Sequence, residues 1–347
     1  MYKDLIDKLE KDTFLTFEEY LELIKNREEI RVYAAERACA VREKYYGNKI
    51  FIRGLIELSN YCKNDCYYCG IRRSNSNCER YRLTSDDILS CADDGYSLGF
   101  RTFVLQGGED AYYTDEILCG VISEIKKKHP DCAVTLSLGE RSYDSYRALK
   151  EAGADRYLLR HETCNKAHYK KLHPKEMSFD ARIECLENLK SLGYQVGAGF
   201  MVGSPFQTDE DLAGELLFLK ELNPQMVGIG PFISHIDTPF AKYSDGTAEL
   251  TAFLISLIRL TLPRVLLPAT TALGTVDPYG RETGILSGAN VLMPNLSPSS
   301  VRKKYMLYDN KICTGEEAAQ CIGCLAERVK KTGCEIVNDR GDYNYDI

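Results

Sequence analysis

Residues 51–69 read FIRGLIELSNYCKNDCYYC, an apolar run followed directly by a polar turn that contains three cysteines. A short apolar run bounded by turn residues is typical of a buried β-strand. Similar runs recur along the chain, and the stretches between them carry polar turns and amphipathic helix signals. The eight runs are FIRGLIEL (51–58), TFVLQ (102–106), AVTLSL (133–138), DRYLLRH (155–161), QVGAGFM (195–201), MVGIGPF (226–232), RVLLPATT (264–271) and ANVLMP (289–294).

Strands that alternate with helices predict a parallel sheet and an α/β fold. In a chain of 347 residues, closure into a (β/α)8 barrel of the TIM type is favoured, and a doubly wound open sheet is the alternative. We expect a helical extension at 1–50, the barrel at 51–300 and a C-terminal helical segment at 301–347. The polar tail at 339–347 is expected to be loosely held.

Composition excludes several classes of function. The formal net charge of -7 argues against a general nucleic-acid binder, which usually presents a basic face. The start, MYKDLIDKLEKDTF, lacks the apolar core of a signal peptide, and the chain has no apolar run long enough to span a membrane. We therefore expect a cytoplasmic protein. There, 14 cysteines indicate metal or redox chemistry rather than a disulfide framework.

Cys62, Cys66 and Cys69 form the most informative cluster. Three thiolates on one loop can hold a [4Fe-4S] cube while leaving one of its four irons without a protein ligand. An open coordination position is what distinguishes a catalytic metal site from a structural one. A zinc knuckle is the alternative, and Cys78 would be its candidate fourth ligand.

Gln106-Gly107-Gly108-Glu109 ends the second strand, in phase with the cysteine loop. Glycines let the backbone approach a ligand closely, and the glutamate can bind a cationic amine. An ordinary strand-to-helix turn is the alternative for this motif.

The CxxxCxxC motif after the first strand of such a barrel resembles the signature of the radical S-adenosylmethionine (SAM) superfamily. The resemblance implies an enzyme with a [4Fe-4S] cluster whose open iron binds SAM. Reductive cleavage of SAM would yield a 5′-deoxyadenosyl radical. The resemblance also places Tyr68 beside the adenine and Gly107–Glu109 at the amino group of SAM.

Polar residues elsewhere in the expected barrel are further candidates for holding SAM. An arginine can pair with the SAM carboxylate through two parallel hydrogen bonds, and a glutamate can accept from ribose hydroxyls or face the sulfonium. Ion pairing at the barrel rim is the alternative. The candidates are Ser137, Glu140, Arg160, Glu162, Arg182 and Met201.

Longer stretches resemble one family within that superfamily, the HydE maturases of [FeFe]-hydrogenase. The resemblance extends from the N-terminal helices to about residue 330. The stretches are 157–163, 197–203, 231–239, 269–275 and 293–295.

This second resemblance implies a role in assembling the diiron subsite of the hydrogenase H-cluster. The implied substrate is a small organometallic or cysteine-derived molecule, a cysteine-bound iron carbonyl–cyanide unit whose sulfur the adenosyl radical attacks. The implied partners are an electron donor such as a ferredoxin or flavodoxin, and fellow hydrogenase maturases. The residues expected at the substrate are Arg156, Thr270, Thr271, Tyr305 and Tyr308.

Cys313, Cys321 and Cys324 form a second group near the C-terminus. By resemblance to HydE proteins this group holds an accessory iron–sulfur cluster, and three unrelated thiols on a helix are the alternative. The group and the ATTALGT stretch at 269–275 favour HydE over methylornithine synthase or a biotin-synthase-like enzyme. A non-enzymatic iron–sulfur scaffold would need no SAM pocket, so the glycine motif and the Arg160–Glu162 pair count against it.

Overall fold

The computed structural model describes residues 2–312, 314–315 and 322–345. Within these residues, a six-stranded parallel sheet in the order β2-β3-β4-β5-β6-β8 forms most of the wall of a barrel. The strands are β2 (Gly54–Ser59), β3 (Thr102–Gly107), β4 (Ala133–Ser137), β5 (Arg156–Leu158), β6 (Gln195–Ala198) and β8 (Met226–Val227).

Isolated parallel bridges close this sheet into a ring. The segments around residues 266–268 and 291–295 stand between β8 and β2, so all eight predicted runs take part. The TIM-type barrel is therefore confirmed, and the open sheet is the wrong alternative. The bridged pairs are Met226–Leu266, Pro268–Val291 and Leu55–Asn295.

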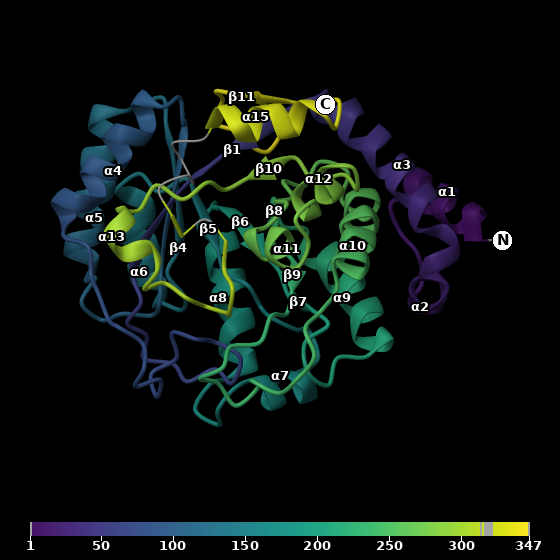
Figure 1. The fold of residues 1–347 in the computed structure, drawn as a ribbon, viewed down its shortest axis with the longest axis horizontal. Coiled ribbons are helices and arrows are strands. Elements are labelled where there is room, and N and C mark those ends of the chain that lie inside the picture. Colours follow the sequence, from purple (N-terminus) through teal and green to yellow (C-terminus); the bar gives the residue numbers. More distant parts are fainter. Residues whose placement is uncertain (1, 313, 316–321, 346–347) are drawn as a thin grey trace.

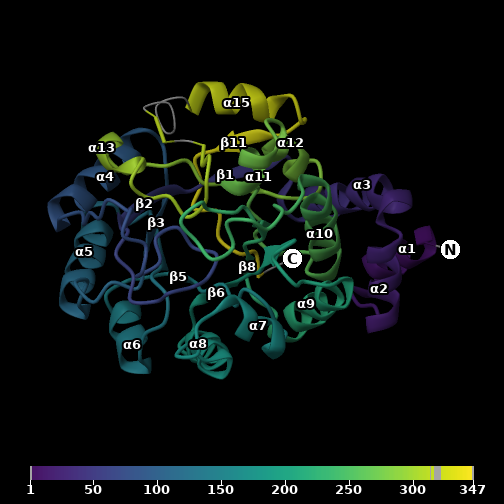
Figure 2. The same ribbon diagram turned by 60° about the horizontal axis from the view of Figure 1, so that its bottom comes forward.

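Helices cover the outside of the strand ring (Figure 2). Thr84 and Thr208 begin two of them as capping boxes, and the apolar faces pack on the strands in one extended core. Among the described residues, none of the helices has the length and apolar character needed to cross a membrane. The barrel helices are α4 (Ser85–Ser97), α5 (Asp115–Lys128), α6 (Tyr143–Glu151), α7 (Lys166–Leu172), α8 (Phe179–Ser191), α9 (Asp209–Leu222), α10 (Ala248–Thr261), α11 (Thr271–Val276), α12 (Gly280–Ile285) and α13 (Ser299–Arg302).

The first three helices attach to one side of the barrel (Figure 1). α1 (Tyr2–Asp12), α2 (Phe17–Lys25) and α3 (Arg27–Tyr46) pack against α9 and α10. The buried Arg42 of α3 donates a hydrogen bond of 2.6 Å to the carbonyl of Ile285 at the end of α12. The extension is thus fixed to the barrel by both apolar packing and a buried polar contact.

The C-terminal segment returns to the end of the barrel at which the strands begin. α15 (Ile322–Lys330) leads into β11 (Glu335–Val337), which pairs with β1 (Lys49–Ile52). On its other side β1 pairs with β10 (Val291–Leu292), while the short strands β7 (Met201–Val202) and β9 (Gly230–Pro231) pair with each other.

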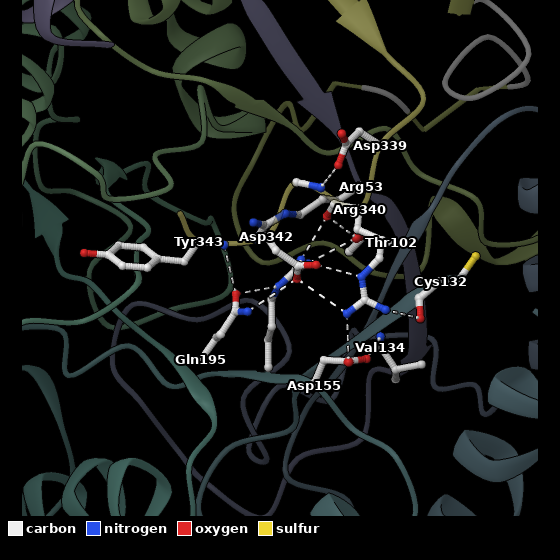
Figure 3. A network of polar contacts seen from close by, with 12 residues as sticks. Arg53, Thr102, Cys132, Val134, Asp155, Gln195, Asp339, Arg340, Asp342 and Tyr343 are labelled. Atoms are coloured by element: carbon white, nitrogen blue, oxygen red, sulfur yellow. Dashed lines mark hydrogen bonds and ion pairs between the residues drawn. The ribbon is translucent and has the colours of Figure 1, made fainter. Parts of the chain in front are cut away.

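The tail beyond β11 closes the floor of the barrel, where the strands begin (Figure 3). Arg340 pairs with Asp155 at 3.0 Å, and Asp342 pairs with Arg156 at 2.6 Å. The expectation of a loosely held tail is therefore wrong for the described residues up to 345. Charged side chains on both sides of the contact explain why a polar segment is fixed here.

Candidate active site

A cavity of about 350 Å³ runs down the inside of the barrel. Its rim is formed by the cysteine loop and the ends of the strands, and Arg53 lies near its floor. The residues predicted at the ends of several strands meet here, as expected for this fold. Those that line it include Cys62, Cys66, Cys69, Tyr68, Gly107, Gly108, Glu109, Ser137, Arg160, Glu162, Arg182, Met201, Thr270, Thr271, Tyr305 and Tyr308.

The three cysteines lie on the loop between β2 and α4, and their thiols are free. Burial raises the pKa of Cys62 and Cys66, and it raises the pKa of Cys69 to about 12. Among the described residues, no three His, Cys, Asp or Glu side chains are close enough to hold a single metal ion. A [4Fe-4S] cube does not require that, because each thiolate binds a different iron. Three thiols that line one cavity are a donor set that suits the cube.

Cys78, the candidate fourth ligand of a zinc site, faces a different environment. Its sulfur accepts a hydrogen bond from Asn60 Nδ2 at 3.4 Å, and it does not line the cavity with the other three.

The glycine motif packs directly against the cysteine loop. A Cβ at Gly108 would lie 2.1 Å from the carbonyl oxygen of Tyr61 and 2.8 Å from Cβ of Cys62, so only glycine fits there. The backbone N–H of Glu109 donates to the sulfur of Cys62 at 3.4 Å. A Cβ at Gly107 would meet its nearest neighbour, Ser59 O, at 3.4 Å, which is tolerable. The two glycines thus have different roles.

The charged rim residues form ion pairs with one another. Arg182 lies 2.7 Å from Glu140 and 3.8 Å from Glu109, and Glu109 also pairs with Lys63 at 3.0 Å. Burial raises the pKa of the Glu140 carboxyl. Glu140 itself lies beside the cavity rather than on its wall, so its contact with the cavity runs through Arg182.

Arg160 and Glu162, which follow the neighbouring strand β5, pair with each other at 3.0 Å. The alternative prediction, that these charged residues form ion pairs at the barrel rim, is therefore confirmed. The same side chains also face the cavity, so pairing among themselves does not remove them from it.

Tyr68 contacts a buried histidine that the sequence analysis does not single out. His173 is buried, and its Nε2 lies 3.1 Å from the Tyr68 hydroxyl. Nδ1 of His173 faces the carbonyl of Tyr169 at 3.0 Å, so Nδ1 carries the proton and Nε2 accepts from Tyr68. Burial lowers the pKa of His173 to about 3. The ring is therefore neutral and fixes the direction of the Tyr68 hydroxyl.

Arg156 does not line the cavity, which corrects the prediction that it contacts substrate. Its guanidinium is fully buried and donates to Thr102 Oγ1 at 3.1 Å, in addition to Asp342 at 2.6 Å. Because Arg156 is the first residue of β5, its side chain lies at the floor, among residues of the tail.

Arg53 is the cation that reaches the cavity from below. Its Nη1 donates to the sulfur of Met226 at 3.0 Å, while Nε and Nη2 have no hydrogen-bond partner among the described residues. Burial, and then the nearby charge of Arg156, lower its pKa well below the usual value. The sequence could have indicated Arg53, because a charged residue within the apolar run 51–58 is expected to have a functional or structural role.

A buried ion pair holds the segment that carries Tyr305. Lys311 Nζ lies 2.5 Å from Glu57 Oε1 and donates to the carbonyl of Tyr305 at 2.8 Å. Asn295 donates to the other oxygen of Glu57 at 2.8 Å. Gln106 Nε2 lies 3.4 Å from the Tyr305 hydroxyl. Glu57 of β2 thus fixes the segment 305–311 over the cavity through its ion pair with Lys311.

Of the second cysteine group, Cys313 and Cys321 lie outside the described residues, and Cys324 is exposed in α15.

Comparison with known proteins identifies the family. The family model of the radical SAM superfamily matches residues 56–219. The chain is 46% identical over 340 residues to the [FeFe] hydrogenase maturase subunit HydE of Thermotoga maritima, covering 98% of this chain and 97% of the relative. It is 30% identical to 3-methylornithine synthase of Methanosarcina barkeri, over 87% and 84% of the two chains.

Solved structures agree. The crystal structure of methylornithine synthase (PylB) superposes with a TM-score of 0.84 at 26% identity, over 96% of this chain and 97% of that one. A structure of the [FeFe]-hydrogenase maturase HydG gives 0.81 at 19% identity, over 96% and 75%, which shows a shared fold. Because the highest of these identities extends over nearly its whole length, the chain belongs to the radical SAM superfamily and, within it, to the HydE family of [FeFe] hydrogenase maturases.

Proposed function

We propose that this chain reductively cleaves SAM and uses the 5′-deoxyadenosyl radical to assemble the diiron subsite of the [FeFe]-hydrogenase H-cluster. The observation that carries the proposal is the 46% identity to a HydE maturase over almost the full length of both chains. The cavity described above supports it, because the cysteines, the glycine motif and the rim charges of a SAM site face one enclosed space.

When bound, the [4Fe-4S] cluster and SAM supply the electron and the scissile S–C5′ bond of this chemistry. Cys62, Cys66 and Cys69 hold the cluster. The backbone at Gly107–Gly108 and the carboxylate of Glu109 bind the amino group of SAM. Arg160 and Arg182 would offer guanidinium groups to its carboxylate.

The remaining contacts orient the nucleoside part of SAM. Tyr68, whose hydroxyl is oriented by His173, would lie beside the adenine, and Glu162 would face the ribose or the sulfonium. Ser137 and Met201 complete the wall of the cavity around the same space.

The lower part of the cavity receives the substrate. We propose a small anionic complex, a cysteine-bound iron carbonyl–cyanide unit, with Arg53 taking the place that sequence reasoning gave to Arg156. The free donors of Arg53 suit a cyanide nitrogen or a carboxylate, and the hydroxyls of Thr270 and Thr271 add donors above it. Tyr305 and Tyr308 cover the substrate and keep water out.

The proposed partners follow from the same role. A ferredoxin or flavodoxin supplies the electron, and fellow maturases such as HydG supply the iron complex and receive the product. Cys313, Cys321 and Cys324 are proposed to hold an accessory cluster without a part in the main reaction.

The test is anaerobic cluster reconstitution, chemical reduction with SAM, and chromatography for 5′-deoxyadenosine. We expect cleavage by the wild type and by Cys119→Ala, a control cysteine on α5, and none by Cys66→Ala. Adding a synthetic cysteine-bound iron carbonyl–cyanide complex should divert the nucleoside into a sulfur-linked adduct. An intact cluster that cleaves SAM but never consumes the complex would contradict the proposed substrate.

The resemblance to methylornithine synthase supports a second candidate within the same superfamily. The reduced enzyme would be incubated with SAM and a mixture of protein amino acids, and the products analysed for 3-methylornithine. Its appearance would replace the maturase proposal. SAM binding without cleavage under any condition would instead favour an iron–sulfur scaffold.

A further inference from the structure

Helix α9 carries a carboxylate that points inward and is fully buried. The Glu215 side chain has no exposed surface. Its Oε2 lies 2.7 Å from Nε2 of His161, and its Oε1 accepts a hydrogen bond of 2.6 Å from the backbone N–H of Cys164. A buried carboxylate is strongly unfavourable unless its oxygens accept hydrogen bonds. Both oxygens here bind the same loop, the one that follows β5.

The proton on His161 can be placed from its neighbours. The backbone N–H of Gly199 donates to Nδ1 of His161 at 3.3 Å, so Nδ1 carries a lone pair. The neutral ring therefore carries its proton on Nε2 and donates it to Glu215. The ring also packs on Phe218 of α9, with a centroid distance of 4.6 Å. His161 thus joins the end of β6 to α9 in one defined tautomer.

Between these two anchored residues lies a strained position. Glu162 has a φ of +68°, in the left-handed region, which is unfavourable for a residue that carries a side chain. Its N–H donates to the carbonyl of Gly199 at 3.0 Å. Such a conformation persists only where the surroundings hold it, and it occurs often at functional sites. Here it turns Glu162 toward Arg160 and the cavity.

A second carboxylate, one turn earlier on α9, also binds the loop that follows β5. Oδ1 of Asp211 accepts from Nδ2 of Asn165 at 2.6 Å, and Asn165 caps α7. The loop from His161 to Asn165 is therefore bound along its length to one face of α9.

We propose that Glu215 is a positioning residue for SAM, acting through His161 and Cys164 to hold Arg160 and Glu162 in the orientation that binds it. The inference rests on the proposed function, because it takes SAM as the molecule that Arg160 and Glu162 contact. Glu215 itself touches no ligand.

Glu215→Gln is the sharpest variant. A glutamine has nearly the same shape, but both partners of Glu215 are donors, so its amide group must face one of them. His161 cannot adapt by moving its proton, since Nδ1 faces the Gly199 N–H. We expect the Kd for SAM of the cluster-reconstituted holoenzyme to rise by about 10- to 100-fold, the usual effect of losing a partner that orients a ligand. Bound iron and Tm should change little, and the KM for SAM should rise more than kcat falls.

Glu221→Gln is the matched control, an exposed residue on the same helix, and should leave the Kd unchanged. If the wild type binds SAM normally and Glu215→Gln binds it with the same Kd, this inference is overturned while the proposed function stands. A lowered Tm with an unchanged Kd would do the same, because it would assign Glu215 to stability only. Failure of the wild-type holoenzyme to bind SAM would overturn the proposed function together with this inference.

A second measurement needs neither SAM nor a variant of Glu215. Nitrogen-15 NMR of the histidine side chains in the cluster-free wild type should show His161 as the Nε2–H tautomer at neutral pH, and the chain has 5 histidines to assign. The Nδ1–H tautomer would remove both the donor to Glu215 and the acceptor for Gly199, and it would overturn the inference even if Glu215→Gln fails to fold.

Discussion

Nη2 of Arg156 lies 2.6 Å from Oδ1 of Asp342, so one ion pair joins the start of β5 to a tail 186 residues further along the chain. Arg156 is fully buried, whereas the Asp342 side chain keeps 38% of its surface exposed. Arg340 bridges the same carboxylate to Asp155. The end of the barrel at which the strands begin is therefore covered by a network of charged side chains rather than by apolar ones.

Asp342→Asn should weaken the fold at neutral pH and reduce its sensitivity to acid. Burial alone would raise the pKa of Asp342, but Arg340 and Arg156 lower it to about 2. Because the folded pKa lies below the unfolded one, this stabilisation is present above pH ~4 and is lost as the pH falls toward 2. Allowing for solvent screening, we expect the variant to lose about 1 kcal/mol at pH 7.

Urea unfolding of the wild type and Asp342→Asn at pH 7 and pH 3 measures this difference. The difference in the free energy of unfolding between the two proteins should be smaller at pH 3 than at pH 7. Asp12→Asn, at an exposed position on α1, serves as the control. A gap of equal size at both pH values would mean that the charge of Asp342 is not what fixes the tail.

Arg53→Met and Arg156→Met should have opposite consequences. Arg53 is a buried cation with unpaired donors, so its removal should leave Tm unchanged or raise it, while consumption of an anionic substrate falls. Arg156→Met removes one of the two arginines that pair with Asp342 and should cost about 2 kcal/mol of stability. Thermal unfolding and adduct formation, measured on both variants, distinguish the two arginines. Loss of turnover in Arg156→Met at full stability would return Arg156 to the substrate site.

Lys311→Met should destabilise the protein strongly. The variant leaves the Glu57 carboxylate buried with only Asn295 beside it, a change that typically costs about 3–5 kcal/mol. The double variant Glu57→Gln/Lys311→Met should recover part of that loss, because no unpaired charge remains. Chemical unfolding of both single variants and the double variant measures the coupling. Strictly additive losses would show that the two residues act independently.

Gly108→Ala should impair cluster assembly, while Gly107→Ala should not. The added methyl group at Gly108 collides with the backbone at Tyr61 and with Cβ of Cys62, which displaces a cluster ligand. Iron per chain after reconstitution is the readout. Both variants are best made with Cys313, Cys321 and Cys324 replaced by alanine, so that iron at the second group does not contribute. Equal iron in the two variants would contradict the required close approach at Gly108.

Much of the fold and the upper site could be predicted because their signals are local. The eight strands are contiguous apolar runs, and the cysteine and glycine motifs each occupy a few consecutive residues. The floor could not be predicted in this way, since the partner of Arg156 comes from the distant tail. Even so, Arg156 opens its strand rather than ending it, and the rule that active sites lie at strand ends argued against placing it at the substrate.

His173 and Glu215 show a different limit. Both lie in segments with ordinary polar helix patterns, and their burial arises only when α7 and α9 pack on the barrel. Nothing in the spacing of these residues indicates that one orients Tyr68 or that the other binds the loop after β5. Partners of this kind become visible only in three dimensions.

The charged floor also bears on how the chain folds during synthesis. Every strand of the barrel ring leaves the ribosome before residues 340–342 do, so the partners of Asp155 and Arg156 are among the last residues to be made. Until residues 340–342 have been made, the guanidinium of Arg156 has no carboxylate from the tail to pair with. The contacts at this end of the barrel can therefore form only after nearly the whole chain has been synthesised.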